Sequence, residues 1–157
     1  FVLKNIKKTD NWLLIHRHVR FGDVDSAGVI HFHNLFRWAH EAWEESLTLY
    51  GLSLNEVFPS PKQRKNHDVA LPIVHCEANF YLPIHIGDNL KIELFPQKLD
   101  EGSFQVEFKF KRDKEEVALS ILKHRAINYQ SRYRCDLPKN IATWLELSLL
   151  KLEITPE

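Results

Sequence analysis

The stretch HFHNLFRWAHEAWEESLTLYG, residues 31–51, repeats apolar side chains at the three- and four-residue spacing of an amphipathic helix. The apolar positions are Phe32, Leu35, Phe36, Ala39, Ala42, Trp43, Leu47 and Tyr50. The opposite face is polar and carries His40 and three glutamates. Gly51 follows as a stop, because glycine readily adopts the left-handed conformation that ends helices. We therefore predict one long helix of about five turns, with an apolar stripe that needs a covering layer.

The residues on either side of this helix follow the two-residue period of β-strands. We expect a first strand over residues 12–21 and four more over residues 69–81, 90–94, 104–110 and 116–130. The pair Glu101-Gly102 supplies a hairpin turn, and such short connections make the later strands antiparallel. A short amphipathic helix is expected after Pro138, with Leu149 on its apolar face, and residues 52–68 are interpreted as an irregular connection. Because a sheet with one apolar face needs a cover, we predict an α+β fold in which a curved antiparallel sheet wraps around one central helix.

The composition is typical of a globular protein rather than of a nucleic-acid-binding or membrane-spanning one. Of the 157 residues, 44% are hydrophobic and 27% are charged, and 21 basic residues balance 21 acidic ones. A nucleic-acid-binding domain usually has a basic excess, and no apolar run approaches the roughly 20 residues of a membrane span. The two cysteines stand in no metal-binding spacing and indicate a reducing compartment. We expect one domain over residues 1–157, with a loose extension over residues 1–10, no secretion signal and a cytoplasmic location.

The segment VRFGDVDSAGVIHFHN, residues 19–34, leads from the first strand into the helix and carries the candidate chemistry. The first N–H groups of a helix lack partners within it, and the helix dipole favours negative charge there. Asp25 lies in a polar turn just before that helix start. A substrate carbonyl placed against the N–H of Phe32 would be polarised with a carboxylate close by, which suits attack on that carbonyl. Taken alone, however, Asp25 is also a normal turn or helix-capping residue.

The same segment resembles the signature of the 4-hydroxybenzoyl-CoA thioesterase family of hotdog proteins. Every fixed position of its pattern, R-[FY]-x-D-x-D-x-x-G-[VI]-[VI] ahead of the central helix, is filled here, by Arg20, Phe21, Asp23, Asp25, Gly28, Val29 and Ile30. The expected order of elements matches over nearly the whole chain. Within the family, residues 31–44, 70–76 and 81–88 are most similar to the 1,4-dihydroxy-2-naphthoyl-CoA hydrolases of phylloquinone biosynthesis. The resemblance implies a hotdog fold and an acyl-CoA thioesterase that releases an aromatic acid, 1,4-dihydroxy-2-naphthoate, from CoA.

The family pattern also implies roles for individual residues. The second aspartate of the motif, Asp25, is implied as the catalytic nucleophile or general base, and the N–H of Phe32 as the oxyanion donor. The expected substrate-binding positions are Gly28, His31, His33 and Ser103. Asp23 and Asn34 are interpreted as structural, through hydrogen bonds within the turn and to the backbone. The resemblance implies no metal and no cofactor, because CoA is part of the substrate, and it implies a homo-oligomer, a tetramer built from dimers.

Other chemistries fit less of the sequence. The pairs His16/His18 and His31/His33 could bind zinc, but no further ligands stand at telling spacings. A hotdog dehydratase would need a histidine with a helix carboxylate, such as His33 with Glu41. The His-Phe-Pro-Gly context of such an enzyme is absent, because His33-Asn34 follows Phe32.

The CoA contacts and the breadth of the function stay open in the sequence. Some relatives hold CoA with basic residues just ahead of a Ser-Phe pair, whereas acidic residues precede Ser103-Phe104 here. The phosphates of CoA could then be held by residues 62–65 or by residues 123–125. The rival functions are a general acyl-CoA thioesterase for aliphatic chains, a non-catalytic acyl-CoA-binding module and a structural oligomerisation domain.

Overall fold

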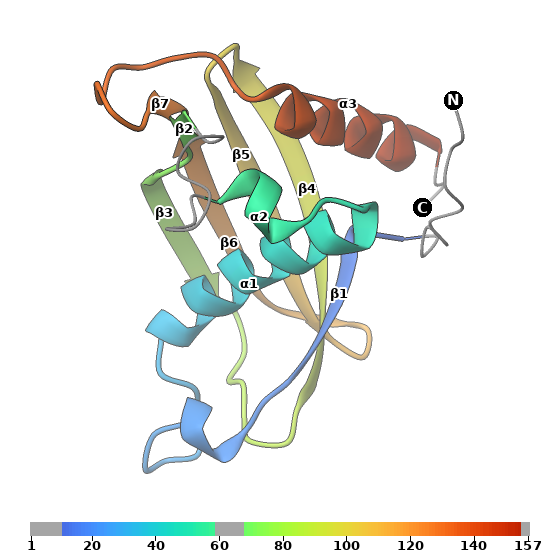
Figure 1. The fold of residues 1–157 in the computed structure, drawn as a ribbon. Coiled ribbons are helices and arrows are strands. Elements are labelled where there is room, and N and C mark those ends of the chain that lie inside the picture. Colours follow the sequence, from blue (N-terminus) through green and yellow to red (C-terminus); the bar gives the residue numbers. More distant parts are fainter. Residues whose placement is uncertain (1–10, 59–67, 155–157) are drawn as a thin grey trace.

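The computed structural model describes residues 11–58 and 68–154, and its elements are labelled in Figure 1. Their order is β1 (Leu14–His18), a 3-10 turn (Phe21–Asp23), α1 (His33–Tyr50), α2 (Leu54–Val57), β2 (Val69–Ala70), β3 (Ile73–Phe80), β4 (Asn89–Asp100), β5 (Ser103–Arg112), β6 (Glu115–Arg125), β7 (Ile127–Asn128) and α3 (Lys139–Ile154). The expected extension over residues 1–10 and the basic residues 62–65 lie outside the described residues.

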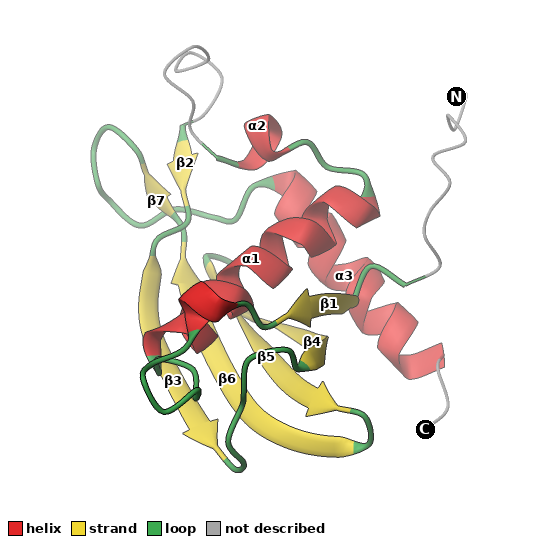
Figure 2. Cartoon of the chain, turned by 90° about the horizontal axis from the view of Figure 1, so that it is seen from below, coloured by secondary structure: helices red, strands yellow, loops and turns green. Residues whose placement is uncertain are grey.

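One antiparallel sheet of five strands, in the order β1-β4-β5-β6-β3, forms the body of the fold. Strands β4, β5 and β6 follow one another as hairpins, with Val106 of β5 opposite Pro96 on one side and Leu122 on the other. The two edge strands come from elsewhere in the chain: β1 from before α1, and β3 from after it. Figures 1 and 2 show the curved sheet with α1 lying across its hollow face.

The core lies between α1 and this face of the sheet. The fully buried apolar side chains of α1, with 0–1% exposure, are Leu35, Trp38, Ala39, Ala42, Trp43 and Leu47. Across from them, β5 buries every second residue, from Phe104 to Phe110, because side chains alternate between the two faces of a strand. Each such Phe or Leu side chain contributes about 1.5–3 kcal/mol when it leaves water. The expected α+β hotdog architecture, a curved antiparallel sheet around one long central helix, is confirmed.

Strand β4 extends beyond the end of β1, and its proline lies in this overhang. Leu94 donates its N–H to the carbonyl of Leu13 at 2.9 Å, near the last contact with β1. Pro96, two residues later, faces the same side of the strand, where β1 no longer runs. A proline has no N–H to give, so it is tolerated only where no ladder bond is needed.

Several predicted boundaries were wrong. The strand expected over residues 69–81 is broken before Ile73 into β2 and β3, since Pro72 cannot donate to a ladder. The strand expected over residues 116–130 ends at Arg125, and its continuation β7 pairs with β2 in a separate two-stranded sheet. The last helix is not short: α3 has 16 residues, and Leu149, expected on its buried side, is 53% exposed. In the described ranges, no helix has the length and apolar character needed to cross a bilayer.

Candidate active site

The segment between β1 and α1 folds into a small hairpin-like loop. Val24 and Ile30 form a β-bridge, and the N–H of Asp25 donates to the carbonyl of Val29 at 2.8 Å. The turn closes with a 3.0 Å hydrogen bond from the N–H of Gly28 to the carbonyl of Asp25. Gly28 has a φ of +76°, which residues with a Cβ rarely adopt, so the turn favours glycine at this position. Its assignment to substrate binding stays a prediction.

The carboxylate of Asp25 is exposed at the tip of this loop. Its Oδ1 accepts hydrogen bonds from the N–H groups of Ala27 at 2.8 Å and Val29 at 3.3 Å. Within the described part of the chain, no hydrogen bond reaches Oδ2. One oxygen therefore fixes the orientation of the carboxylate, and the other is left available to a substrate or to water, since the residue is exposed.

The start of α1 supplies the second component of the site. Phe32 already has helical dihedrals, φ −53° and ψ −37°, and its carbonyl accepts the first bond of the helix from the N–H of Leu35 at 3.2 Å. Among the described residues, no hydrogen bond engages the N–H of Phe32. This group is a free donor at the positive end of an 18-residue helix dipole, where negative charge is favoured.

The loop and the helix start are joined through the backbone carbonyl of Asp23. That oxygen accepts the side-chain amide of Asn34 at 2.8 Å and the N–H of His31 at 3.1 Å. The carboxylate of Asp23 is buried and accepts the N–H of Arg20 at 2.9 Å. The structural interpretation of Asp23 and Asn34 is thus confirmed.

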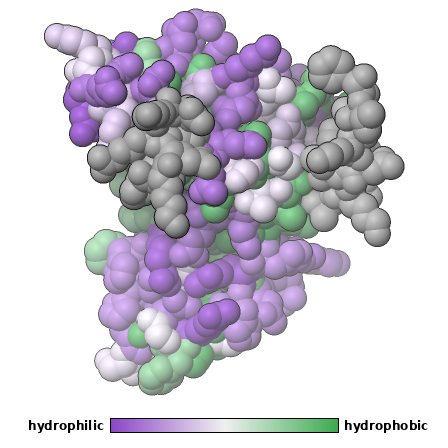
Figure 3. Space-filling view, viewed as in Figure 1, coloured by the Kyte–Doolittle hydropathy of each residue, from purple (hydrophilic) through white to green (hydrophobic). Residues whose placement is uncertain are grey.

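An apolar cavity of about 390 Å³ adjoins this loop. It is lined by Val29, Ile30, Phe32, Phe80, Tyr81, Leu82, Pro83 and Ile84. The two walls are held together by the bridge between Val29 and His85 and by a 3.0 Å bond from the N–H of Ile30 to the carbonyl of Ile84. Figure 3, in the view of Figure 1, shows hydrophobic side chains exposed at the end of the molecule where these segments lie. Residues 80–84 were not predicted as site residues, although residues 81–88 contribute to the family resemblance.

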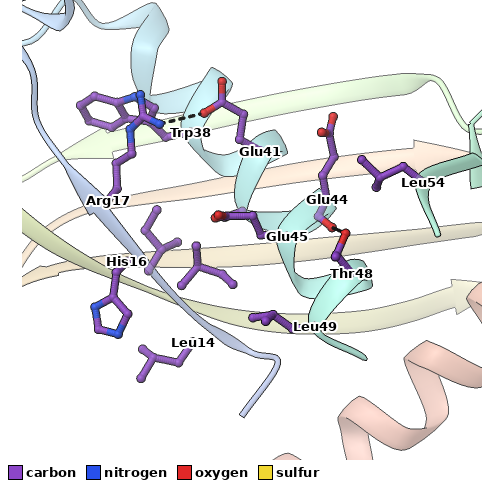
Figure 4. Close-up of a pocket in the computed structure, with 13 residues that line it drawn as sticks. Leu14, His16, Arg17, Trp38, Glu41, Glu44, Glu45, Thr48, Leu49 and Leu54 are labelled. Atoms are coloured by element: carbon purple, nitrogen blue, oxygen red, sulfur yellow. Dashed lines mark hydrogen bonds and ion pairs between the residues drawn. The ribbon is translucent and has the colours of Figure 1, made fainter. Parts of the chain in front are cut away.

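The chain has a larger cavity, of about 610 Å³, between β1 and α1. Figure 4 shows Arg17 and Trp38 at one end of it and Leu54 at the other. Neither Asp25 nor Phe32 lines this cavity. The smaller cavity is the candidate active site, because Phe32 lines it together with Val29, whose N–H holds the carboxylate of Asp25.

The predicted histidines stand on either side of Phe32 in the chain, and neither lines the smaller cavity, so their assignment to substrate binding stays a prediction. His31 and His33 are exposed, with their rings stacked at a centroid distance of 5.5 Å. The dehydratase pairing of His33 with Glu41 gains no support, because Glu41 is engaged with Arg17 at 3.2 Å. His18 contacts Asn89 at 2.7 Å, and no cluster of three or more ligating side chains suited to a metal occurs in the described ranges.

Ser103 is not brought to Asp25 within one chain. It begins β5 at the hairpin end of the sheet, is 2% exposed, and adjoins a cavity of about 310 Å³ lined by Arg125 and Arg134 among others. Arg125 there pairs with Asp100 at 3.2 Å. Arg134 was not predicted as a site residue, since its spacing from Arg125 carries no motif. The assignment of Ser103 to substrate binding stays a prediction.

Comparison with known proteins agrees with this fold. A family model described as Thioesterase-like superfamily matches residues 19–145. A 1,4-dihydroxy-2-naphthoyl-CoA hydrolase of Prochlorococcus marinus is 56% identical over 145 residues, which cover 92% of this chain and 94% of the relative. The crystal structure of a 1,4-dihydroxy-2-naphthoyl-CoA thioesterase from Synechocystis superposes with a TM-score of 0.76 at 27% identity, covering 85% of this chain and 94% of the other. A gentisyl-coenzyme A thioesterase gives a TM-score of 0.69 at 26% identity, covering 82% and 98%. With its family signature, its fold and these relatives in agreement, the chain belongs to the thioesterase-like superfamily.

Proposed function

We propose that this protein hydrolyses 1,4-dihydroxy-2-naphthoyl-CoA to 1,4-dihydroxy-2-naphthoate and CoA, a step of phylloquinone biosynthesis. The observation that carries the proposal is that one short segment beside an apolar cavity carries both Asp25, whose Oδ2 accepts no hydrogen bond from the described residues, and Phe32, whose N–H is unengaged among them. The relative that is 56% identical is named for this reaction, which supports the choice of acyl group.

The geometry accommodates the two requirements of thioester hydrolysis. The carbonyl oxygen of the thioester would accept the N–H of Phe32, which then stabilises the negative charge that develops on attack. Asp25 would either attack the carbonyl carbon itself or remove a proton from the attacking water. The C–S bond breaks, the thiolate of CoA leaves and takes up a proton, and water supplies the hydroxyl of the acid. These steps use only groups of this chain and water.

The 390 Å³ cavity suits an aromatic acyl group. Its lining is apolar, and three of its eight residues are the aromatic side chains Phe32, Phe80 and Tyr81. Aromatic rings pack well against one another in offset or edge-on arrangements. The phenolic oxygen of Tyr81 offers a hydrogen-bond partner for a ring hydroxyl, because this side chain is 52% exposed.

We also propose that two chains pair through β3, giving a homodimer from which a tetramer is built, and that the protein is cytoplasmic. β3 is an edge strand, and seven of its eight residues are exposed. Its large apolar side chains Ile73, Val74 and Phe80 are 42%, 56% and 48% exposed. An exposed apolar edge strand is a ready template for pairing with another strand, so a second copy of this chain would protect it.

The test is the release of free thiol from a panel of CoA thioesters by the wild type and by Asp25→Asn. We expect the naphthoyl ester to be preferred over 4-hydroxybenzoyl-, benzoyl- and hexanoyl-CoA. Asn keeps the size of Asp25 but cannot act as base or nucleophile, so turnover should fall by a factor on the order of a thousand. Equal rates on hexanoyl-CoA would replace the proposal with a general acyl-CoA thioesterase. Ester binding without turnover by the wild type would indicate a binding module.

A further inference from the structure

Among the described residues, the side chain of Asp25 makes no hydrogen bond beyond its own turn. Both hydrogen bonds to its Oδ1 come from within the loop, from Ala27 and Val29. The carboxylate of Asp25 therefore does not itself fix the loop against the start of α1. Catalysis depends on the distance between Asp25 and the N–H of Phe32, so some other group has to fix the loop against the helix.

Asp23 fixes the loop against the helix, because three segments of the chain meet at this residue. Its carbonyl holds Asn34 of α1 and His31 just before the helix, and its Oδ2 holds the N–H of Arg20 at the end of the β1 segment. With 4% exposure, its carboxylate is buried. A buried carboxylate needs a cationic or hydrogen-bonding partner to remain charged.

Arg37, on the second turn of α1, supplies that partner. Its Nη2 donates to Oδ1 of Asp23 at 2.7 Å, a short charge-assisted hydrogen bond. A second guanidinium, that of Arg17 on β1, stands 3.9 Å from the same oxygen and pairs with Glu41 at 3.2 Å, which Figure 4 shows as a dashed line. Arg37 also approaches Glu41 at 3.9 Å. Two arginines and two carboxylates thus tie β1, the loop and α1 together.

We propose that Asp23 and Arg37 form a positioning pair that holds the carboxylate of Asp25 in register with the N–H of Phe32. The inference rests on the proposed thioesterase function. Arg37 acts on the site through Asp23, to which it donates. Neighbouring groups limit the cost of breaking the pair: Arg17 stands 3.9 Å from the same oxygen of Asp23, and Arg37 is 50% exposed and lies 3.9 Å from Glu41. The effect of losing it should consequently appear in the rate of the chemical step rather than in folding.

The test is a double-mutant cycle of Asp23→Asn, Arg37→Gln and the double variant, with kcat, KM and Tm measured for each. A misplacement of about 1 Å can cost on the order of a hundredfold in rate, so we expect each single variant to lose between about tenfold and a hundredfold in kcat. KM and Tm should change little, and the double variant should lose no more than the more damaging single variant, because both changes break one link. Arg37→Lys, which keeps the cation, should recover part of the rate.

A matched control is Lys111→Gln, which breaks a 3.0 Å ion pair with Glu93 on the opposite face of the sheet from α1 and should leave kcat unchanged. The positioning role would be overturned if Asp23→Asn and Arg37→Gln kept the wild-type kcat. Losses of kcat that add up in the double variant, or that parallel a fall in Tm, would overturn it as well. If the wild type cleaves no thioester, the proposed function fails instead. Amide exchange over residues 24–32 then decides the positioning role: faster exchange in both variants supports it, and unchanged exchange overturns it.

Discussion

His124 is the most strongly perturbed titratable side chain of the described chain. It points from β6 into the core, stacked on Phe104 at a centroid distance of 4.7 Å and next to Trp43 at 4.6 Å. Burial lowers its pKa from 6.5 to about 4, and the hydrogen bond to the carbonyl of Leu71 only partly offsets that effect. In the sequence this residue stood in a basic run considered for binding CoA phosphates. A neutral, buried imidazole is unsuited to that task.

The low pKa of His124 makes a prediction about stability and pH. In the unfolded chain His124 binds a proton below about pH 6.5, whereas in the folded chain it does so only below about pH 4. The free energy of unfolding therefore falls as the pH drops through this window. The loss reaches on the order of 3 kcal/mol at the acid end. Urea unfolding between pH 7.5 and 4.5 should show a steeper loss for the wild type than for His124→Phe. His16→Gln, a change at an exposed histidine, should keep the wild-type slope, and an equal slope in His124→Phe would contradict the assignment.

At the scale of elements, α1 is defined by how it ends as much as by its apolar stripe. Gly51 adopts a φ of 116°, and its N–H donates to the carbonyls of Leu47 and Thr48. The N–H of Leu52 also donates to Leu47, at 2.9 Å, which completes a Schellman-type cap. This cap turns the chain toward α2, and the glycine was predictable because few other residues accept that conformation at low cost.

Gly51→Ala should therefore lower the free energy of unfolding by about 1 kcal/mol, since a Cβ strains a left-handed residue. Activity should persist, because the cap lies at the far end of α1 from Phe32. The free energy of unfolding is measured by chemical denaturation for Gly51→Ala and for the control Gly22→Ala. At Gly22 an added Cβ meets no atom within 4 Å, so this variant should keep the wild-type stability. Equal stability of the two variants would mean that the cap contributes nothing.

At the scale of the whole molecule, the exposed edge strand β3 presents backbone groups that no strand among the described residues pairs with on its outer side. The N–H of Tyr81 donates to the carbonyl of Val117, and beyond the register shift after Ile73 the pairing runs evenly from Glu77↔Ile121 to Phe80↔Ala118, so the backbone N–H and C=O groups of the odd-numbered residues Glu77 and Asn79 point toward β6. Hydrogen bonding alternates along an antiparallel strand. The N–H of Ala78 therefore points away from the sheet, toward any second strand that pairs with it.

Ala78→Pro should block pairing of β3 with a second chain and leave the bond ladder to β6 intact, because it removes only an outward-facing N–H. Sedimentation or light scattering should then report a monomer for this variant and an oligomer for the wild type. Ala78→Val, which keeps the N–H, is the matched control and should remain oligomeric. An oligomeric Ala78→Pro with normal circular dichroism would place the interface elsewhere.

Local patterns in the sequence determined much of the candidate site. The motif around Asp23, Asp25 and Gly28 predicted the loop, and the helical repeat that follows predicted α1 and the free N–H at its start. These features depend on neighbours within a few residues, through backbone conformation and side-chain period, so a single sequence specifies them.

The tertiary structure decided what depends on distant partners. Three contacts join segments that are far apart in the chain: β1 pairs with β4, residues 80–84 line the cavity beside Phe32, and Arg37 donates to Asp23. Ser103, which the family pattern associates with CoA, proved to be buried at the other end of the sheet. The two-residue period predicts which side chains lie on each face of a strand. It does not predict which strands pair, because strand pairing depends on the packing of the whole core.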